Sequence, residues 1–421
     1  MISTIESLNY KARVRKQLFL FLILPLASLI NAFKYKNLKI ITNTVWAFVV
    51  FHGFTLIIYS EGIDAARYAE KLENLHNQPI TWYNFLLSFF SSQNVDIIEP
   101  LLSYGVSLFT DNSRVLFLVY GIVFGYFYSR NIGYLIKNVH FKYSKSVIFL
   151  ITIFALTIPF WEMNGVRMWT AAHIFFFAAV RIIDGKFHLK NIVLLLLAPL
   201  MHFSFVLPVT VLMAFKILGN RPLLYYISFL FTFLISEIEL GAVKEIVTNY
   251  TPEFLNDRVV AYTQDNQMEN IKEQALDNAF YIRYQGIASK IGMIILLSYL
   301  VALKKTLRRV SPKAYNYLSF SLFFLSIANL ISLIPSGGRF LSVAYLFAIT
   351  TFLLFWGAKH FQVKPLLLEK IAFSCFFFSG FISLWKGFQT MSVMLVIGNP
   401  VFALFSNLET SLAQVIKLEF L

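Results

Sequence analysis

The sequence has little charge and almost no cysteine. Only 14% of the 421 residues are charged, whereas 58% are hydrophobic. A soluble domain of this length carries far more charge, and no stretch has the size and polarity of a soluble catalytic domain. The single cysteine, Cys375, excludes an internal disulfide and a cysteine-based metal site. We expect Cys375 to be a small buried hydrophobic side chain.

The spacings of common metal and nucleic-acid sites are also missing. The sequence contains no His-x-x-His or His-Glu-x-x-His pattern, and no Asp-x-Asp pattern in the segments predicted below to be external. The net charge is +14, but the lysines and arginines are scattered over many short loops. Such scatter does not form a nucleic-acid-binding stripe. We therefore predict no metal, no cofactor and no nucleic-acid partner.

Long apolar runs occupy most of the chain, and its mean hydropathy is +0.67. These runs are about 16 to 22 residues long, enough to cross a hydrocarbon core of about 30 Å. We predict an all-α, polytopic integral membrane protein, a single domain over 1–421, with roughly 11–13 membrane segments plus re-entrant or interfacial helices and external loops. The predicted segments lie near 17–33, 40–59, 115–136, 146–160, 168–183, 191–201, 205–218, 222–240, 287–303, 315–334, 340–357, 369–386 and 389–405.

Loop charges predict the orientation of these segments. Lysine and arginine collect in five loops that we assign to the cytoplasm, namely 137–145, 181–190, 216–221, 304–313 and 359–370. The opposite side then receives 60–114, 161–167, 202–204, 237–290 and 335–339, where acidic residues outnumber basic ones. The basic N-terminus breaks this rule if 17–33 spans once. Either 17–33 is a re-entrant or interfacial helix kinked near Pro25, or the number of segments is off by one.

Two of the predicted external segments are long. Residues 60–114 include an aromatic run from Trp82 to Phe90, which predicts an amphipathic helix lying at the membrane interface. Residues 241–286 are polar, and we predict that they form an external loop or lid over the membrane face.

The short turn 161–167 is the most unusual polar feature. Glu162 and Arg167 are the only charged residues between Lys145 and Arg181. Charge held at a membrane surface is costly unless it binds something. Asn164 and Gly165 allow another group to approach the backbone closely. The alternative for Arg167 is an arginine whose side chain reaches lipid phosphates.

Further polar residues fall on the same predicted side, which makes a common pocket plausible. They are Asp64, Arg67, Tyr68, Glu99, His202, Ser204 and Arg339. Most of these residues also have a simpler structural explanation. Asp64 and Arg67 are three apart and could pair on one helix turn. Glu99-Pro100 could only start a helix, His202 could be a satisfied core histidine, and Arg339 could reach lipid phosphates.

At these residues the sequence resembles the EpsG-like family of polytopic membrane proteins. The resemblance is carried by short motifs in the family's order over roughly residues 40–350. They are Asp64–Tyr68, Asp96–Pro100, Ser107–Asn112, Asn164–Arg167 leading into Trp169–Ala172, His202–Ser204 and Gly338–Phe340. The family is associated with bacterial exopolysaccharide, capsule and O-antigen products, and is taken to include Wzy-type polymerases.

The resemblance implies a polysaccharide polymerase of the bacterial cytoplasmic (inner) membrane with its active face periplasmic or extracellular. Such an enzyme transfers a growing glycan from undecaprenyl pyrophosphate onto the non-reducing end of a lipid-linked repeat unit. Implied partners are the undecaprenyl-pyrophosphate-linked oligosaccharide, membrane lipids, a flippase and a chain-length regulator. Arg167 and Arg339 would bind the pyrophosphate, with Asn164, Arg67, Tyr68 and Ser204 as further substrate-binding residues. The base for the acceptor hydroxyl would be His202, Glu99, Glu162 or Asp64, with the first two preferred.

Three other functions remain open at this stage. A flippase or transporter of the same lipid-linked oligosaccharide would also have many helices, but such proteins tend to show internal repeats, and none is visible here. A membrane O-acyltransferase would modify the polysaccharide. A non-catalytic scaffold of the export complex would have no activity of its own.

Overall fold

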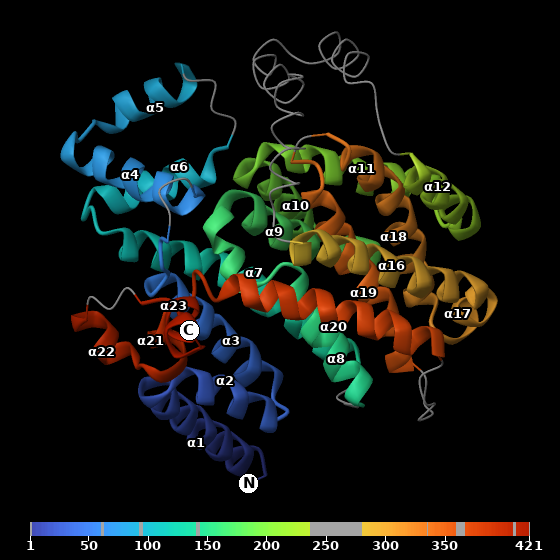
Figure 1. Cartoon of the computed structure of the whole chain (residues 1–421), viewed down its shortest axis with the longest axis horizontal. Coiled ribbons are helices and arrows are strands. Elements are labelled where there is room, and N and C mark those ends of the chain that lie inside the picture. Colours follow the sequence, from blue (N-terminus) through green and yellow to red (C-terminus); the bar gives the residue numbers. More distant parts are fainter. Residues whose placement is uncertain are drawn as a thin grey trace.

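The computed structural model is a bundle of α-helices (Figure 1). It describes residues 2–59, 63–91, 96–139, 144–235, 280–334, 336–358, 367–406 and 410–420. Within these ranges no strand forms, and the only strand-like pairing is one bridge between Ser392 and Ser411. Most of the predicted loop 241–286 lies outside the described residues, and its last part is the start of α16 (Phe280–Ala302).

The described ranges confirm a multi-pass membrane protein. Six helical stretches in them are long and apolar enough to cross a membrane, and four shorter helices are apolar too. One stretch, Lys145–Ile183, is in fact two helices, α8 (Lys145–Thr157) and α9 (Val166–Ile183), separated by the 3-10 turn η1 (Phe160–Gly165). The turn predicted at 161–167 is therefore present.

Helix α7 (Ser113–Asn138) lies along α3 (Leu38–Phe54), and small residues bring the two helices close together. A Cβ atom added at Gly53 would lie 2.2 Å from the carbonyl oxygen of Phe117, and one at Gly133 would lie 2.5 Å from Cγ2 of Thr42. Only glycine permits this spacing, which maximises van der Waals contact where lipid provides no hydrophobic drive between helices.

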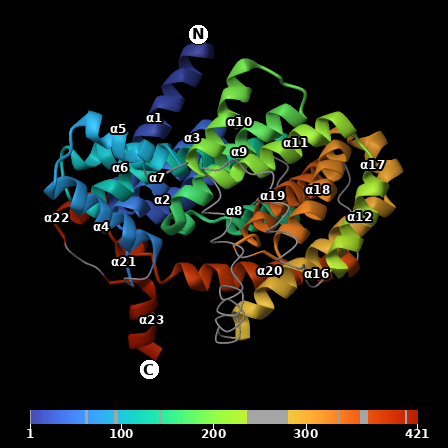
Figure 2. The same ribbon diagram turned by 90° about the horizontal axis from the view of Figure 1, so that it is seen from above.

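A second group of helices packs beside α9, which contacts it mainly through α19. It contains α12 (Pro222–Leu234), α16, α18 (Pro312–Ile331), α19 (Arg339–Ala358) and α20 (Leu367–Gly387). The ring of Phe347 on α19 lies 4.8 Å from those of Phe176 on α9 and Phe320 on α18. Helix α18 contacts both α12 and α19, and α16 runs beside α20 (Figure 2).

The predicted external segment 60–114 contains three helices, α4 (Asp64–Asn77), α5 (Trp82–Ser91) and α6 (Ile98–Ser107). The predicted helix near 82–90 is confirmed as α5. Phe85 on it is buried and stacks 4.3 Å from the ring of Tyr104 on α6, whereas Tyr83 is 69% exposed. Both views place α4, α5 and α6 at the opposite end of the molecule from α12 and α17 (Lys304–Val310) (Figures 1 and 2).

The two ends of the chain differ from simple spans. Residues 17–33 bend at Leu24, where α1 (Ile2–Ile23) gives way to α2 (Pro25–Lys34), so the kink near Pro25 is confirmed. Helix α2 folds back on α1, and the Gln17 amide donates to the Ser28 hydroxyl at 2.8 Å.

The prediction of one segment at 389–405 is wrong, because two short helices, α21 (Val393–Ile397) and α22 (Pro400–Phe405), are separated at Gly398-Asn399. Pro400 has no N–H to continue a helix. A final helix, α23 (Leu412–Phe420), follows.

Candidate functional site

Three of the predicted site residues, Glu162, Asn164 and Arg167, lie in or directly after the 3-10 turn η1. Pro159 precedes the turn and Gly165 ends it. A Cβ atom on Gly165 would lie 3.1 Å from the indole of Trp169, so glycine allows the turn to fold tightly against α9. Glu162, Asn164 and Arg167 leave this turn toward three different neighbours.

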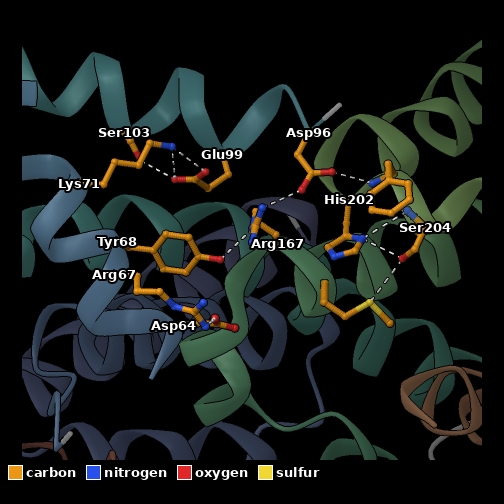
Figure 3. A network of polar contacts seen from close by, with 12 residues as sticks. Asp64, Arg67, Tyr68, Lys71, Asp96, Glu99, Ser103, Arg167, His202 and Ser204 are labelled. Carbon is orange, nitrogen blue, oxygen red and sulfur yellow. Dashed lines mark hydrogen bonds and ion pairs between the residues drawn. The ribbon is translucent and has the colours of Figure 1, made fainter. Parts of the chain in front are cut away.

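Arg167 binds two segments that are distant in sequence (Figure 3). Its Nη1 donates to Oδ2 of Asp96 at 2.9 Å, and its Nε donates to the hydroxyl of Tyr68 at 3.0 Å. The other oxygen of Asp96, Oδ1, accepts from the backbone N–H of Phe203 at 2.8 Å. Asp96 is 3% exposed, so Arg167 neutralises a buried carboxylate and joins α9, α4 and the segment after α10 (Leu189–Met201).

Tyr68 lies beside this ion pair on α4. Its ring meets the ring of Tyr120 edge to face at 5.8 Å. Burial raises the pKa of Tyr68 to about 12, and the negative charges of Asp64 and Glu99 add to the rise while Arg167 opposes it. The phenol is therefore neutral at physiological pH, and its hydrogen is available for donation.

Glu99 on α6 is enclosed by hydrogen-bond donors. It accepts from the Ser103 hydroxyl at 2.6 Å, the Tyr120 hydroxyl at 2.9 Å and Lys71 Nζ at 3.2 Å. The residue is only 2% exposed. A general base needs an open face toward the proton it removes, and this carboxylate has none in the structure.

The other residues predicted on α4 belong to its first turn. Asp64 and Arg67 form an ion pair one helix turn apart, with the Arg67 side chain 68% exposed. The Asn164 side chain accepts from the backbone N–H of Ala65 at 3.0 Å, one of the free donors at a helix start. Asn164 thus ties η1 to α4.

His202 and Ser204 lie at the 3-10 turn η2 (Phe203–Phe205), which leads into α11 (Val206–Leu218). Nδ1 of His202 lies 2.8 Å from the Ser204 hydroxyl and accepts from the Ser204 backbone N–H at 3.3 Å. A neutral imidazole that accepts at Nδ1 carries its proton on Nε2. In this geometry the proton of a neutral His202 ring lies on Nε2.

Glu162 faces a cavity between membrane helices. The cavity has a volume of ≈ 330 Å³ and is walled by α8, α16, α19 and α20. Its charged lining residues are Glu162, Lys290 and Lys386. The indole of Trp169 also lines the cavity, and the positive charges of Lys386 and Arg339 act on the Glu162 carboxylate. Apolar side chains such as Met293 and Phe376 share the rest of the lining with hydroxyl groups, from Thr157, Ser289, Ser342, Tyr345, Ser379 and Ser383.

The structure thus divides the predicted residues into two groups. Glu162 lines the cavity, whereas Arg339 lies outside its lining and acts on Glu162 through its charge. Arg167, Tyr68, Asp64, Arg67, Glu99, His202 and Ser204 take part in the polar network behind η1 (Figure 3). Asn164 joins η1 to the start of α4. Among the residues that are described, no three His, Cys, Asp or Glu side chains converge as metal ligands.

Sequence reasoning missed several members of both groups. Asp96 appeared only within a family motif, and Lys71 lies in the helix α4, which was not predicted. Lys290 and Lys386 were overlooked inside the predicted segments 287–303 and 369–386. Their charge within an apolar segment could have identified these two lysines, because charged residues in such segments usually face a cavity or a partner.

The chain matches no protein-family model, no curated protein and no solved structure. The fold itself defines the class, a multi-pass α-helical membrane protein with a charged cavity between its helices.

Proposed function

We propose that the protein is a Wzy-type polysaccharide polymerase of the bacterial cytoplasmic membrane, acting on lipid-linked repeat units at the outer face. The observation that supports this function best is the cavity, which is lined by one carboxylate, Glu162, and two cations, Lys290 and Lys386. The charge of Arg339, outside this lining, also acts on Glu162. A membrane glycosyl transfer from a lipid pyrophosphate needs these two kinds of group side by side.

The cations suit the leaving group. A pyrophosphate carries several negative charges near the membrane surface, and lysine and arginine are its usual protein ligands. Lys290 on α16 and Lys386 on α20 approach the cavity from two walls, with Arg339 at the start of α19 near Glu162. Ile287 on α16 and Phe377 on α20 are exposed outside the cavity lining and suit contact with a polyprenyl chain.

The carboxylate suits the acceptor. The hydroxyl oxygen at the non-reducing end attacks the anomeric carbon of the growing glycan, and its proton passes to Glu162. The bond between the anomeric carbon and the pyrophosphate oxygen breaks, and the bonding electrons leave with the undecaprenyl pyrophosphate. The serine hydroxyls of the cavity would hydrogen-bond sugar oxygens. Arg167, Asn164 and Tyr68 hold η1 in place and act as positioning residues.

Purified protein and lipid-linked repeat units test this proposal. We expect a ladder of products from the wild type, and a rate about 10²–10⁴-fold lower for Glu162→Gln, the usual range for loss of a general base. Lys386→Gln should also slow the reaction. Glu73→Gln, on the exposed face of α4, and Lys370→Gln, exposed near the start of α20, are the matched controls.

The readout separates the alternatives. Transbilayer movement of the lipid-linked sugar without a ladder would identify a flippase, and transfer of a labelled acyl group would identify an O-acyltransferase. A full ladder from Glu162→Gln would show that this carboxylate is not the base. Absence of a ladder from folded wild-type protein would refute the polymerase itself.

A further inference from the structure

A second cavity lies at the far ends of α7 and α9. It has a volume of ≈ 620 Å³, and its lining includes six cations: Lys39, Arg130, Lys137, Arg181, Lys186 and Lys313. Helix α9 has 18 residues between the end bearing Arg167 and the end bearing this cavity. At about 1.5 Å per residue the helix is about 27 Å long, close to one hydrocarbon thickness, so its two ends lie near opposite membrane surfaces.

The cavity has a large excess of positive charge. Asp184 is its only acidic lining residue, and it is already satisfied. It accepts from Lys313 at 2.8 Å, from Tyr134 at 2.9 Å and from Tyr317 at 3.2 Å. The other five cations take part in none of the ion pairs that the described chain contains.

The two arginines on its wall are held in place without being neutralised. Arg130 donates to the Thr42 carbonyl at 3.1 Å and to the Asn43 side chain at 2.9 Å, with its guanidinium 4.9 Å from the centre of the Tyr126 ring. Arg181 donates to the Phe177 carbonyl and lies 3.4 Å from the centre of the Phe177 ring. Aromatic rings and neutral carbonyls orient these groups but leave their charge uncompensated.

A simpler explanation accounts for only part of this arrangement. Basic residues gather in cytoplasmic loops of membrane proteins in general, and they favour helix C-termini such as the ends of α7 and α9. Neither effect requires cations from α3, α7, α9 and α18 to converge on one cavity. Basic pockets between membrane helices are known to hold anionic headgroups.

We propose that this cavity binds a phosphate group, carried by an anionic lipid headgroup or by a soluble phosphate compound. Half-buried Arg130 and Arg181 would provide directed N–H donors to the phosphate oxygens, and exposed Lys39, Lys137 and Lys186 would attract the anion at the rim. This site is independent of the polymerase proposal, because it lies at the other end of the helices.

Ligand titration of the purified full-length chain in a neutral detergent tests the site. The probes are dihexanoyl phosphatidylglycerol, dihexanoyl phosphatidylcholine and sodium phosphate at constant ionic strength, with the thermal unfolding midpoint followed by tryptophan fluorescence. The variants are Lys137→Gln/Lys186→Gln at the rim and Arg181→Gln on the wall. Lys190→Gln/Arg308→Gln removes the same charge from exposed positions outside the cavity.

We expect saturable stabilisation whose apparent Kd is about tenfold higher in the rim and wall variants and unchanged in the control. A response to phosphatidylglycerol alone would identify a lipid headgroup as the ligand, and a response to sodium phosphate with the same residue dependence would identify a soluble phosphate. Equal stabilisation by phosphatidylcholine, or equal Kd values in all variants, would overturn the proposal. If Arg181→Gln does not fold, the rim variant still tests the proposal, because Lys137 and Lys186 are both exposed.

Discussion

Arg167 connects parts of the chain that the sequence does not show to be close. Asp96 lies 71 positions before it, and Tyr68 lies 99 positions before it. The sequence could predict that a charged turn at the membrane surface needs a partner. It could not identify Asp96 as that partner, because the pairing depends on how α4 and α6 pack against η1, α7 and α10.

The pair of Arg167 and Asp96 should be energetically coupled. Arg167→Gln leaves the buried Asp96 carboxylate with one donor, which we expect to cost about 1–3 kcal/mol of unfolding free energy. Adding Asp96→Asn to that variant should recover part of the loss. Thermal unfolding of the four proteins of the double-mutant cycle measures the coupling, with Arg67→Gln on the exposed face of α4 as a control. Purely additive effects would show that the two side chains act independently.

Glu162 illustrates what could be predicted at a single residue. Its isolation among apolar residues marked it as a candidate, and it does line the cavity. The sequence alone could not favour Glu162 over Glu99 as the proposed base, because both are carboxylates on the same predicted side. Glu99 has three donors and is 2% exposed, and no sequence pattern reveals that enclosure.

At the scale of elements, the contact between α3 and α7 depends on glycine. A methyl group at Gly53 meets the Phe117 carbonyl, so Gly53→Ala must push the helices apart. We expect a loss of about 1–3 kcal/mol of stability, as for other overpacked sites. Gly105→Ala on α6, where nothing lies within 4 Å of the added Cβ, is the matched control. Unfolding midpoints of the two variants in detergent provide the comparison, and equal midpoints would contradict close packing here.

The start of α4 depends on η1. Asn164→Ala removes the acceptor for the Ala65 N–H, and loss of a comparable helix cap costs about 1 kcal/mol. We expect faster amide exchange in the first turn of α4, measured by hydrogen–deuterium exchange and mass spectrometry. Asn164→Asp keeps an acceptor oxygen and should exchange like the wild type. Unchanged protection in Asn164→Ala would mean that another group holds this turn.

The elements differ in how well the sequence predicts them. The segments expected at 315–334 and 340–357 match α18 and α19 within three residues, because a long apolar run has few alternatives in a membrane. Helix α4 was not predicted, since its polar sequence lacks the apolar run on which the segment predictions rested. The segment 389–405 failed for the opposite reason. Its apolar composition predicted a single segment, although Gly398 and Pro400 interrupt the helix and divide it into α21 and α22.

For the whole molecule, the charge of the loops predicts the side on which the candidate site lies. In a Cys375→Ser background, Arg67→Cys on α4 and Lys190→Cys at the start of α10 report on the two sides. We expect a membrane-impermeant maleimide to label the first cysteine in intact cells and the second only after permeabilisation. Labelling in the reverse order would invert the topology and place the Glu162 cavity on the cytoplasmic side.

Composition was sufficient to predict the class of protein but not the division of its polar residues between a cavity and a network. Depth and side could be read from apolar runs and loop charges. The lateral arrangement of helices could not, because hydropathy hardly separates a mostly buried helix such as α19 from a mostly exposed one such as α20. Hence the contribution of α16 and α20 to the Glu162 cavity was not predicted.

The connection between α8 and α9 also has a consequence for biosynthesis. Helix α8 has 13 residues, whereas an independent span needs about 20 apolar residues. If the labelling places η1 outside, Glu162 and Arg167 must cross the hydrocarbon once during insertion, at about 2.5–3.5 kcal/mol for a charge at a helix centre. Helix α8 is too short to span the bilayer by itself, and the charged turn is costly to move across the bilayer by itself. The translocon would therefore have to release α8 and α9 into the bilayer together, as one helical hairpin.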